Sequence, residues 1–228
     1  TLRDVRDLCG IYEVDPETSA ELMELAREAY KPGWWAKYDD LVIAPLIGME
    51  QSATAITSFG MYFLPALLQS EDYARAVIKG IAPKITEKVL NQRVEARMER
   101  QKLLDGPTPP RYRVLLDEAV LRRHFGGPAV MRDQLDRILS LIREEKATVQ
   151  VIPFMVGAYG ASDSNFTYLE FGGTKLPNLV YVETLVSHLY IERPDEVDRY
   201  SEALDHLRDS ALNPRDSAMK IEEIRDEF

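Results

Sequence analysis

A proline-rich break near the middle of the chain separates two kinds of sequence pattern. The run Gly106-Pro107-Thr108-Pro109-Pro110 cannot continue a helix, because proline lacks a backbone N–H and its ring clashes with the preceding turn. Before this run apolar residues recur every three or four positions, whereas Tyr112, Val114 and Leu116 alternate directly after it. The change of period predicts a helical N-terminal half followed by a half that contains strands.

The first thirty residues predict two short helices. Leu2, Val5 and Leu8 have helical spacing, and Gly10 is the expected stop. Asp15-Pro16-Glu17 then supplies an N-cap, a proline for the first turn and an acidic side chain for the positive end of the helix.

The segment from Ala44 to Leu104 predicts mainly helix, and Met49, Ala53 and Ile56 are expected to form one apolar helical face. A long helix is expected from about Thr86 to Leu104. Its basic face is typical of a solvated surface with i,i+4 ion pairs, and phosphate binding is the alternative. The basic residues of that face are Arg93, Arg97, Arg100 and Lys102.

After the break the pattern alternates between strands and helices. Helices are expected to begin at Pro128 and Pro194, with one more short helix in the tail. The expected strands cover Tyr112 to Leu116, Thr148 to Phe154, Phe166 to Phe171 and Leu179 to Val182. We therefore predict an α+β fold: a helical N-terminal half followed by a small mixed sheet in the order β-α-β-β-β-α, with packed helices.

Charge and composition exclude several classes of protein. The 228 residues hold 28 Lys and Arg against 38 Asp and Glu, a net charge of −10, which argues against coating a nucleic acid or an anionic membrane with the whole surface. The longest apolar stretches, such as Leu41 to Met49, are far shorter than the ~20 residues of a membrane span. With Cys9 as its only cysteine and no signal-peptide pattern, the chain is expected to be cytoplasmic and without membrane partners.

Recognised catalytic motifs are missing from the sequence. His124, His188 and His206 lack the spacing of metal ligands, and there is no HExxH, no P-loop and no GxSxG pattern. We therefore expect no metal, no cofactor, no catalytic residues and no enzymatic activity.

Two tryptophans and a tyrosine are candidates for one wall of a ligand pocket. Trp34 and Trp35 stand together just after the Pro32-Gly33 break, and Tyr62 follows later in the helical half. Aromatic side chains of this kind either bury a linker against a domain or line a ligand site.

Polar residues at the ends of expected strands are the other candidates. Asp117 and Glu118 end the strand that begins near Arg111, while Tyr181 and Glu183 lie at the end of the Leu179 strand. Such positions suit the polar anchors of a pocket between the helical and sheet halves. Helix capping or pairing with the arginines at 122 and 123 explains the two acidic neighbours equally well.

Five phrases in fixed order resemble a known family. They are YFLPALLQSEDYARAVI (62–78), RVEARMERQKLL (93–104), RVLLDEAVLRRHFGGPAVMRDQL (113–135), VQVIPF (149–154) and LVYVETLVSHLYIERPDEVDRY (179–200). Together they resemble the uncharacterised C-terminal domain that follows an Xre-type helix-turn-helix in many actinobacterial transcriptional regulators, over about residues 34–221.

The resemblance also implies a domain organisation. Residues 1–31 are similar to the last helices of such a helix-turn-helix domain, so the recognition helix and its DNA contacts are expected before Thr1 and none is assigned to this chain. Residues 32–228 would form an effector or sensor domain, with a helical part over 32–105 and an α/β part over 106–228.

The function that this resemblance implies is transcription regulation. The chain would be mainly a ligand- or partner-sensing and oligomerisation domain of an antitoxin-like regulator, which binds DNA through its N-terminal part and forms a homodimer. Its effector would be a small molecule or a small partner protein. The alternative is a small-molecule-binding protein or an enzyme with a pocket between the helical and sheet halves.

Overall fold

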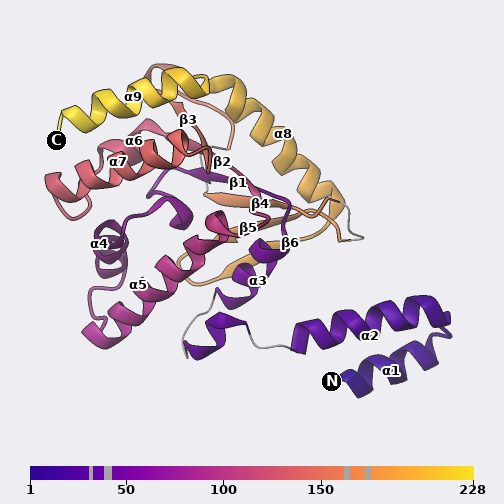
Figure 1. Ribbon diagram of the computed structural model, residues 1–228. Helices are drawn as coiled ribbons and strands as arrows, with labels where there is room; N and C mark the ends of the chain where they lie inside the picture. Colours follow the sequence, from indigo (N-terminus) through magenta and orange to yellow (C-terminus); the bar gives the residue numbers. More distant parts are fainter. Residues whose placement is uncertain (31–32, 39–42, 162–164, 173–175) are drawn as a thin grey trace. The chain divides into compact units, whose positions relative to one another are not determined.

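The computed structural model describes residues 1–228 except 31–32, 39–42, 162–164 and 173–175 (Figure 1). The contacts between residues divide the chain into two compact units, Thr1–Leu41 and Val42–Phe228. The boundary that the sequence suggests, between residues 31 and 32, lies outside the described residues.

The first unit is a helix pair followed by one short 3-10 helix. Helices α1 (Leu2–Ile11) and α2 (Pro16–Tyr30) have the predicted positions, and Asp15 accepts a hydrogen bond from the Thr18 amide at 2.9 Å, which confirms the predicted N-cap. Gly10 lies inside α1 rather than ending it. The 3-10 helix η1 (Trp34–Lys37) holds both tryptophans, whose rings meet edge to face.

A six-stranded mixed sheet is the centre of the second unit, with the strand order β3-β2-β1-β4-β5-β6. Strands β1 (Ala55–Gly60), β2 (Arg111–Asp117) and β3 (Thr148–Ile152) are parallel. Strands β4 (Phe166–Glu170), β5 (Leu179–Glu183) and β6 (His188–Ile191) continue as an antiparallel meander from β1. The α+β class is thus confirmed, and four of the six strands were predicted.

The prediction was wrong for β1, which was expected to be helical. Its six residues are all buried, because β1 lies in the interior of the sheet with neighbours on both sides and both faces covered. A strand buried on both faces shows no alternation of apolar and polar residues, and the chance spacing of Met49, Ala53 and Ile56 imitates a helix. The short edge strand β6 was missed as well.

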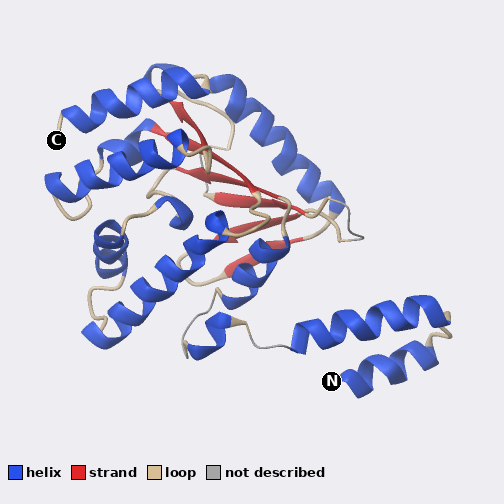
Figure 2. Cartoon of the chain, in the orientation of Figure 1, coloured by secondary structure: helices blue, strands red, loops and turns tan. Residues whose placement is uncertain are grey.

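Helices cover both faces of the sheet (Figure 2). Helix α8 (Pro194–Ser210) packs Val197, Leu204 and Leu207 on one face. The opposite face carries α7 (Pro128–Arg143) and α9 (Pro214–Asp226), with α6 (Glu118–Arg122) beside them. All of these helices except the short α6 begin at a proline. Proline suits the first helical turn because a backbone N–H at that position would have no partner within the helix.

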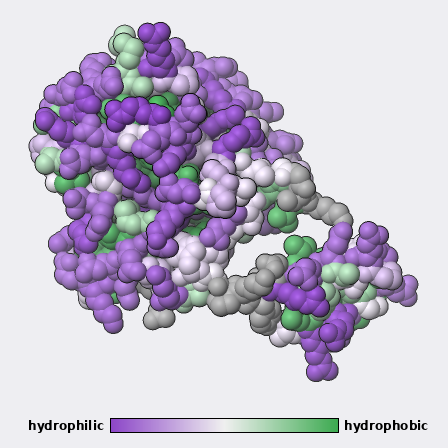
Figure 3. Space-filling view, viewed as in Figure 1, coloured by the Kyte–Doolittle hydropathy of each residue, from purple (hydrophilic) through white to green (hydrophobic). Residues whose placement is uncertain are grey.

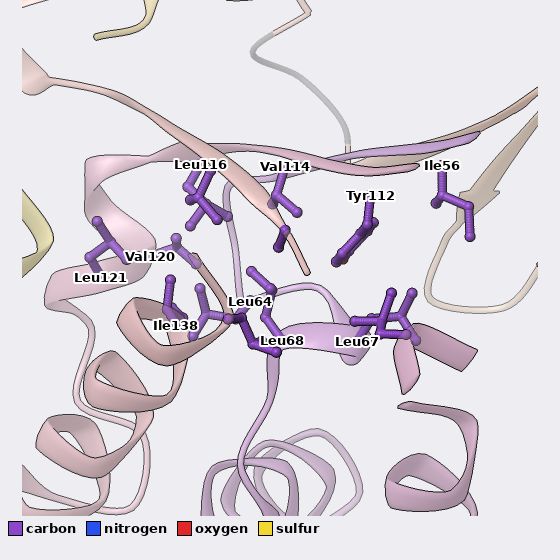
Figure 4. Close-up of a cluster of buried hydrophobic side chains, with 14 of the residues drawn as sticks. Ile56, Leu64, Leu67, Leu68, Tyr112, Val114, Leu116, Val120, Leu121 and Ile138 are labelled. Atoms are coloured by element: carbon purple, nitrogen blue, oxygen red, sulfur yellow. The ribbon is translucent and has the colours of Figure 1, made fainter. Parts of the chain in front are cut away.

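The connection from β1 to β2 also lies on this second face. The segment runs through η2 (Ala66–Leu68), α4 (Glu71–Ile81), α5 (Glu87–Gln101) and η3 (Lys102–Asp105). Ser70 and Thr86 cap α4 and α5 through their hydroxyls. In Figure 4, Ile56 and Tyr112 point from the sheet towards Leu67, so this connection closes the core over the sheet.

Helix α3 (Ala44–Ser52) precedes β1, and η4 (Phe154–Val156) follows β3. Within the described part of the chain, no helix is both long enough and apolar enough to cross a membrane.

Candidate functional site

A cavity of about 450 Å³ lies on the α5 side of the sheet, within the second unit. Its lining comes from α3, the carboxyl ends of β1 and β5, the start of β4, α5 and the segment from Tyr62 to Gln69. Most of the wall is apolar, but four charged side chains reach it. They are Glu50, Arg97, Arg100 and Glu183.

Two of these charges neutralise each other. The guanidinium of Arg100 donates from Nε and Nη2 to the two carboxylate oxygens of Glu50, each at 2.6 Å. The side chains are 10% and 2% exposed, so the pair is almost completely removed from water. Burial alone would lower the pKa of Arg100, but the adjacent carboxylate of Glu50 raises it above the ordinary arginine value. This bidentate pair ties α5 to α3.

Arg97 lies one turn earlier on α5 and has no such partner. Its Nη1 donates to Oε1 of Gln69 at 2.8 Å, and no carboxylate of a described residue lies within ion-pair distance. Burial and the charge of Arg100 lower the pKa of Arg97 to about 10, so the side chain still carries its charge at neutral pH. Among the described residues, the cation of Arg97 is therefore hydrogen-bonded only to a neutral amide, and the carboxylate of Glu183 acts on it from a distance.

The expectation that the basic face of α5 is solvated was wrong for Arg97 and Arg100. Arg100 is 10% exposed and pairs with Glu50, and Arg97 is only partly exposed and lines the cavity. The expectation failed because it assumed ion pairs along α5, whereas neither arginine has Glu95 or Glu99 three or four positions away, and this part of the helix faces α3 and the sheet.

Buried amides hold the loop before α4 in place around Arg97. Gln69 donates from Nε2 to the Leu64 carbonyl at 2.6 Å, and Gln101 donates to the carbonyls of Ala66 and Gln69. Arg137 in turn donates to Oε1 of Gln101. Gln69 is completely buried, so its bond to Arg97 is made in a fixed orientation.

The phenols near the cavity add no charge. Burial raises the pKa of Tyr112 and of Tyr181, with the carboxylate of Glu183 contributing for Tyr181. Tyr181 shares a hydrogen bond of 2.6 Å with Nδ1 of His188. The Tyr112 hydroxyl meets no partner with hydrogen-bond geometry among the described residues, although Ser58 is close enough to influence its ionisation.

The structure brings three of the seven sequence candidates together. Tyr62, Tyr181 and Glu183 line this cavity. Trp34 and Trp35 belong to the first unit and are not among the described residues of the cavity wall.

Asp117 and Glu118 also lie outside that wall, at the carboxyl end of β2. In the sheet order, β2 and β5 are separated by three strand-to-strand steps of about 4.8 Å each. Asp117 caps α6 by accepting from the Ala119 amide at 2.8 Å, and it accepts a second hydrogen bond from Tyr159. The predicted alternative of helix capping is therefore confirmed for this residue.

Glu118 is the first residue of α6 and is 6% exposed. It accepts from Nε of Arg122 at 2.7 Å and from the Phe154 amide at 3.0 Å, with Nζ of Lys220 at 3.8 Å. Burial alone would raise the pKa of Glu118, but these donors and cations lower it below the ordinary glutamate value. The predicted alternative of pairing with Arg122 is confirmed.

Sequence reasoning missed Glu50 and Gln69, and it named Arg97 and Arg100 only as part of a basic face for which phosphate binding was the alternative. The signal that could have indicated Glu50 is that it is the isolated acidic residue of an otherwise uncharged α3. Elsewhere in the described residues, no group of three or more His, Cys, Asp or Glu is arranged to hold a metal ion.

Comparisons with known proteins place the second unit in one family. No curated protein and no solved structure matches the chain. Residues 43–223, which include every described residue of the cavity wall, match a domain of unknown function termed DUF5753. Because that match spans well over half of its residues, the chain belongs to the DUF5753 family.

Proposed function

We propose that this chain is mainly the effector-sensing and oligomerisation part of a cytoplasmic, DNA-binding transcription regulator. The cavity carries the sensing role: it lies between helices and sheet in the family domain, has an apolar wall, and contains a few fixed polar groups. Small-molecule sites in proteins have this composition.

The DNA-binding role is supported by the sequence of residues 1–31, which resembles the end of an Xre-type helix-turn-helix domain. Apolar side chains remain exposed on this helix pair, as expected of helices that pack against further helices (Figure 3). They are Leu8, Ile11, Tyr12, Leu22 and Leu25. The pair is acidic, so DNA contacts are assigned to residues before Thr1.

The experiment that tests the proposal is a gel-shift assay of the full-length gene product on the DNA upstream of its own gene. We expect a shift at low salt that weakens as salt rises, because phosphate contacts release counterions. Absence of a shift at low salt, with and without any small protein encoded beside the gene, would contradict DNA binding.

Dimerisation is the second part of the proposal, since paired helix-turn-helix units bind paired half-sites. Light scattering of the same protein should give twice the mass of one chain. A monomer at the concentration that shifts DNA would contradict this part.

A ligand-binding protein or an enzyme without a DNA role is the alternative, and the cavity supports it equally. A molecule that raises the melting temperature but never changes DNA binding would favour a ligand-binding protein. Turnover of that molecule would favour an enzyme.

A further inference from the structure

We propose that the cavity binds a small organic monoanion, an apolar molecule that bears one carboxylate, and that the carboxylate pairs with Arg97. This inference deepens the sensing role proposed above, because it names the chemical class of the effector.

The first step is the charge balance of the wall. Of the four charged residues, Glu50 and Arg100 are already joined in a bidentate pair. Glu183 is exposed to water at the end of β5, where solvent screens its charge, and it forms no ion pair with Arg97, although its carboxylate raises the pKa of Arg97 from a distance. Arg97, which is only partly exposed, is therefore the one cation among the described wall residues that forms no ion pair, and the carboxylate of Glu183 acts on it only from a distance.

The second step is the state of its guanidinium group. Only Nη1 is engaged, by Gln69. The other nitrogens form no hydrogen bond with a described residue, and the side chain lines the cavity. A guanidinium with free donors on one edge matches the geometry of a carboxylate.

The third step is preorganisation. Gln69 is fixed by the Leu64 carbonyl and holds Arg97 from behind, while Gln101 holds the backbone of Gln69. Little side-chain freedom remains to be lost when a ligand binds, which favours affinity.

The fourth step concerns the size and charge of the ligand. Leu46, Phe63 and Leu67 contribute apolar surface to the wall, and about 450 Å³ accommodates an aromatic or medium-chain body. One uncompensated cation neutralises one negative charge. A dianionic phosphate would leave a second negative charge near Glu50 and Glu183, so the wall favours a monocarboxylate.

The experiment uses two matched pairs of probes with this chain. Isothermal titration calorimetry compares 2-naphthoate with its neutral amide 2-naphthamide, and octanoate with octanamide. We expect at least one carboxylate to bind, and its own amide to bind about tenfold to a hundredfold more weakly, as expected for the loss of a charged hydrogen-bonded contact.

Variant Arg97→Gln should bind the carboxylate about tenfold to a hundredfold more weakly, so that acid and amide then bind equally. Arg93→Gln is the matched control: it removes a positive charge one turn away on α5, from a residue outside the described wall of the cavity, and should keep the preference. Circular dichroism checks that both variants are folded.

Three results would each overturn the proposal. They are equal affinity for acid and amide, a carboxylate preference that survives Arg97→Gln, and no carboxylate of either pair binding more tightly than ~1 mM. Because these titrations contain no DNA and the gel shift contains no ligand, failure of the anion site and failure of the DNA-binding role are distinguished.

Discussion

Two places along one edge of the sheet differ in how their charged side chains are paired. At the carboxyl end of β2, Asp117 and Glu118 have partners for their oxygens, and the ion pairs involve Arg122 and Lys220. In the cavity beside the carboxyl ends of β1 and β5, Arg97 is charged, and its only hydrogen bond to a described side chain is the one that it donates to the amide oxygen of Gln69.

The difference separates polar groups that hold the fold from a polar group that is free to bind. A buried charge without a counterion costs folding free energy, whereas a saturated pair holds two elements together. Carboxylates at strand ends look alike in sequence, but those at β2 connect α6 to η4 and α9. Removing one charge of a saturated pair, at Glu118 or within the Glu50–Arg100 pair of the cavity, should therefore lower stability, whereas removing the charge of Arg97 should change ligand binding.

The largest effect is expected from Glu50→Gln, which leaves the buried guanidinium of Arg100 without its counterion. We expect the free energy of unfolding to fall by about 3–5 kcal/mol. Urea denaturation followed by circular dichroism measures this change.

The double variant Glu50→Gln/Arg100→Gln is the control, because it removes both charges. It should recover part of the loss, so that its free energy of unfolding falls by less than the sum of the two single-variant losses. A double variant whose loss equals the sum of the losses of Glu50→Gln and of Arg100→Gln, each measured alone, would show that the pair is not the contact that ties α3 to α5.

The sequence allowed the α+β class and most boundaries to be predicted, since Ser70, Thr86 and Pro128 are local signals that act within one turn. It did not indicate β1, because the residues that make Ala55–Gly60 a strand are its neighbours Arg111–Leu116 and Phe166–Glu170, which are far away along the chain.

The same limit applied to the cavity. Tyr181 and Glu183 could be proposed because strand ends border pockets, but the pairing of Arg100 with Glu50 joins residues fifty positions apart. Whether a basic helix face points to water or into a domain depends on tertiary packing. The spacing of its charges, which is all that the sequence displays, is the same in both cases.

An intermediate effect is expected from Glu118→Gln, at the saturated end of the comparison. The variant keeps the shape of the side chain but weakens its bonds to Arg122 and the Phe154 amide, so the free energy of unfolding should fall by about 2 kcal/mol at pH 7. Affinity for 2-naphthoate or octanoate should stay unchanged, because Glu118 lies outside the described cavity wall. A loss of affinity in a variant that stays folded would contradict the claim that Glu118 stabilises the fold without taking part in ligand binding.

The stability difference between Glu118→Gln and the unchanged protein should also depend on pH. The pKa of Glu118 is lowered in the folded state, so the unfolded chain takes up its proton first as the pH falls. The contribution is complete above the ordinary glutamate value of 4.5 and is lost as the pH falls through the lower folded value. Denaturation at pH 7 and at about pH 3.5 measures the difference, which should be smaller in acid. An unchanged difference would contradict a charged role for Glu118.

The smallest effect on stability is expected from Arg97→Met, although it changes the same residue type as Arg100→Met one turn away. Arg97→Met loses the bond to Gln69 but relieves the cost of a desolvated charge, so the free energy of unfolding should stay within about 1 kcal/mol of its original value. Arg100→Met, in contrast, leaves Glu50 buried and unpaired and should cost about 3–5 kcal/mol. Thermal and urea unfolding of the two variants side by side measures this contrast, and equal losses would show that Arg97 is structural. If Arg97→Met keeps its stability and loses the carboxylate preference, the guanidinium of Arg97 serves binding rather than folding. Burying a charge costs free energy, so a partly buried charge that does not stabilise the fold is expected at a functional site.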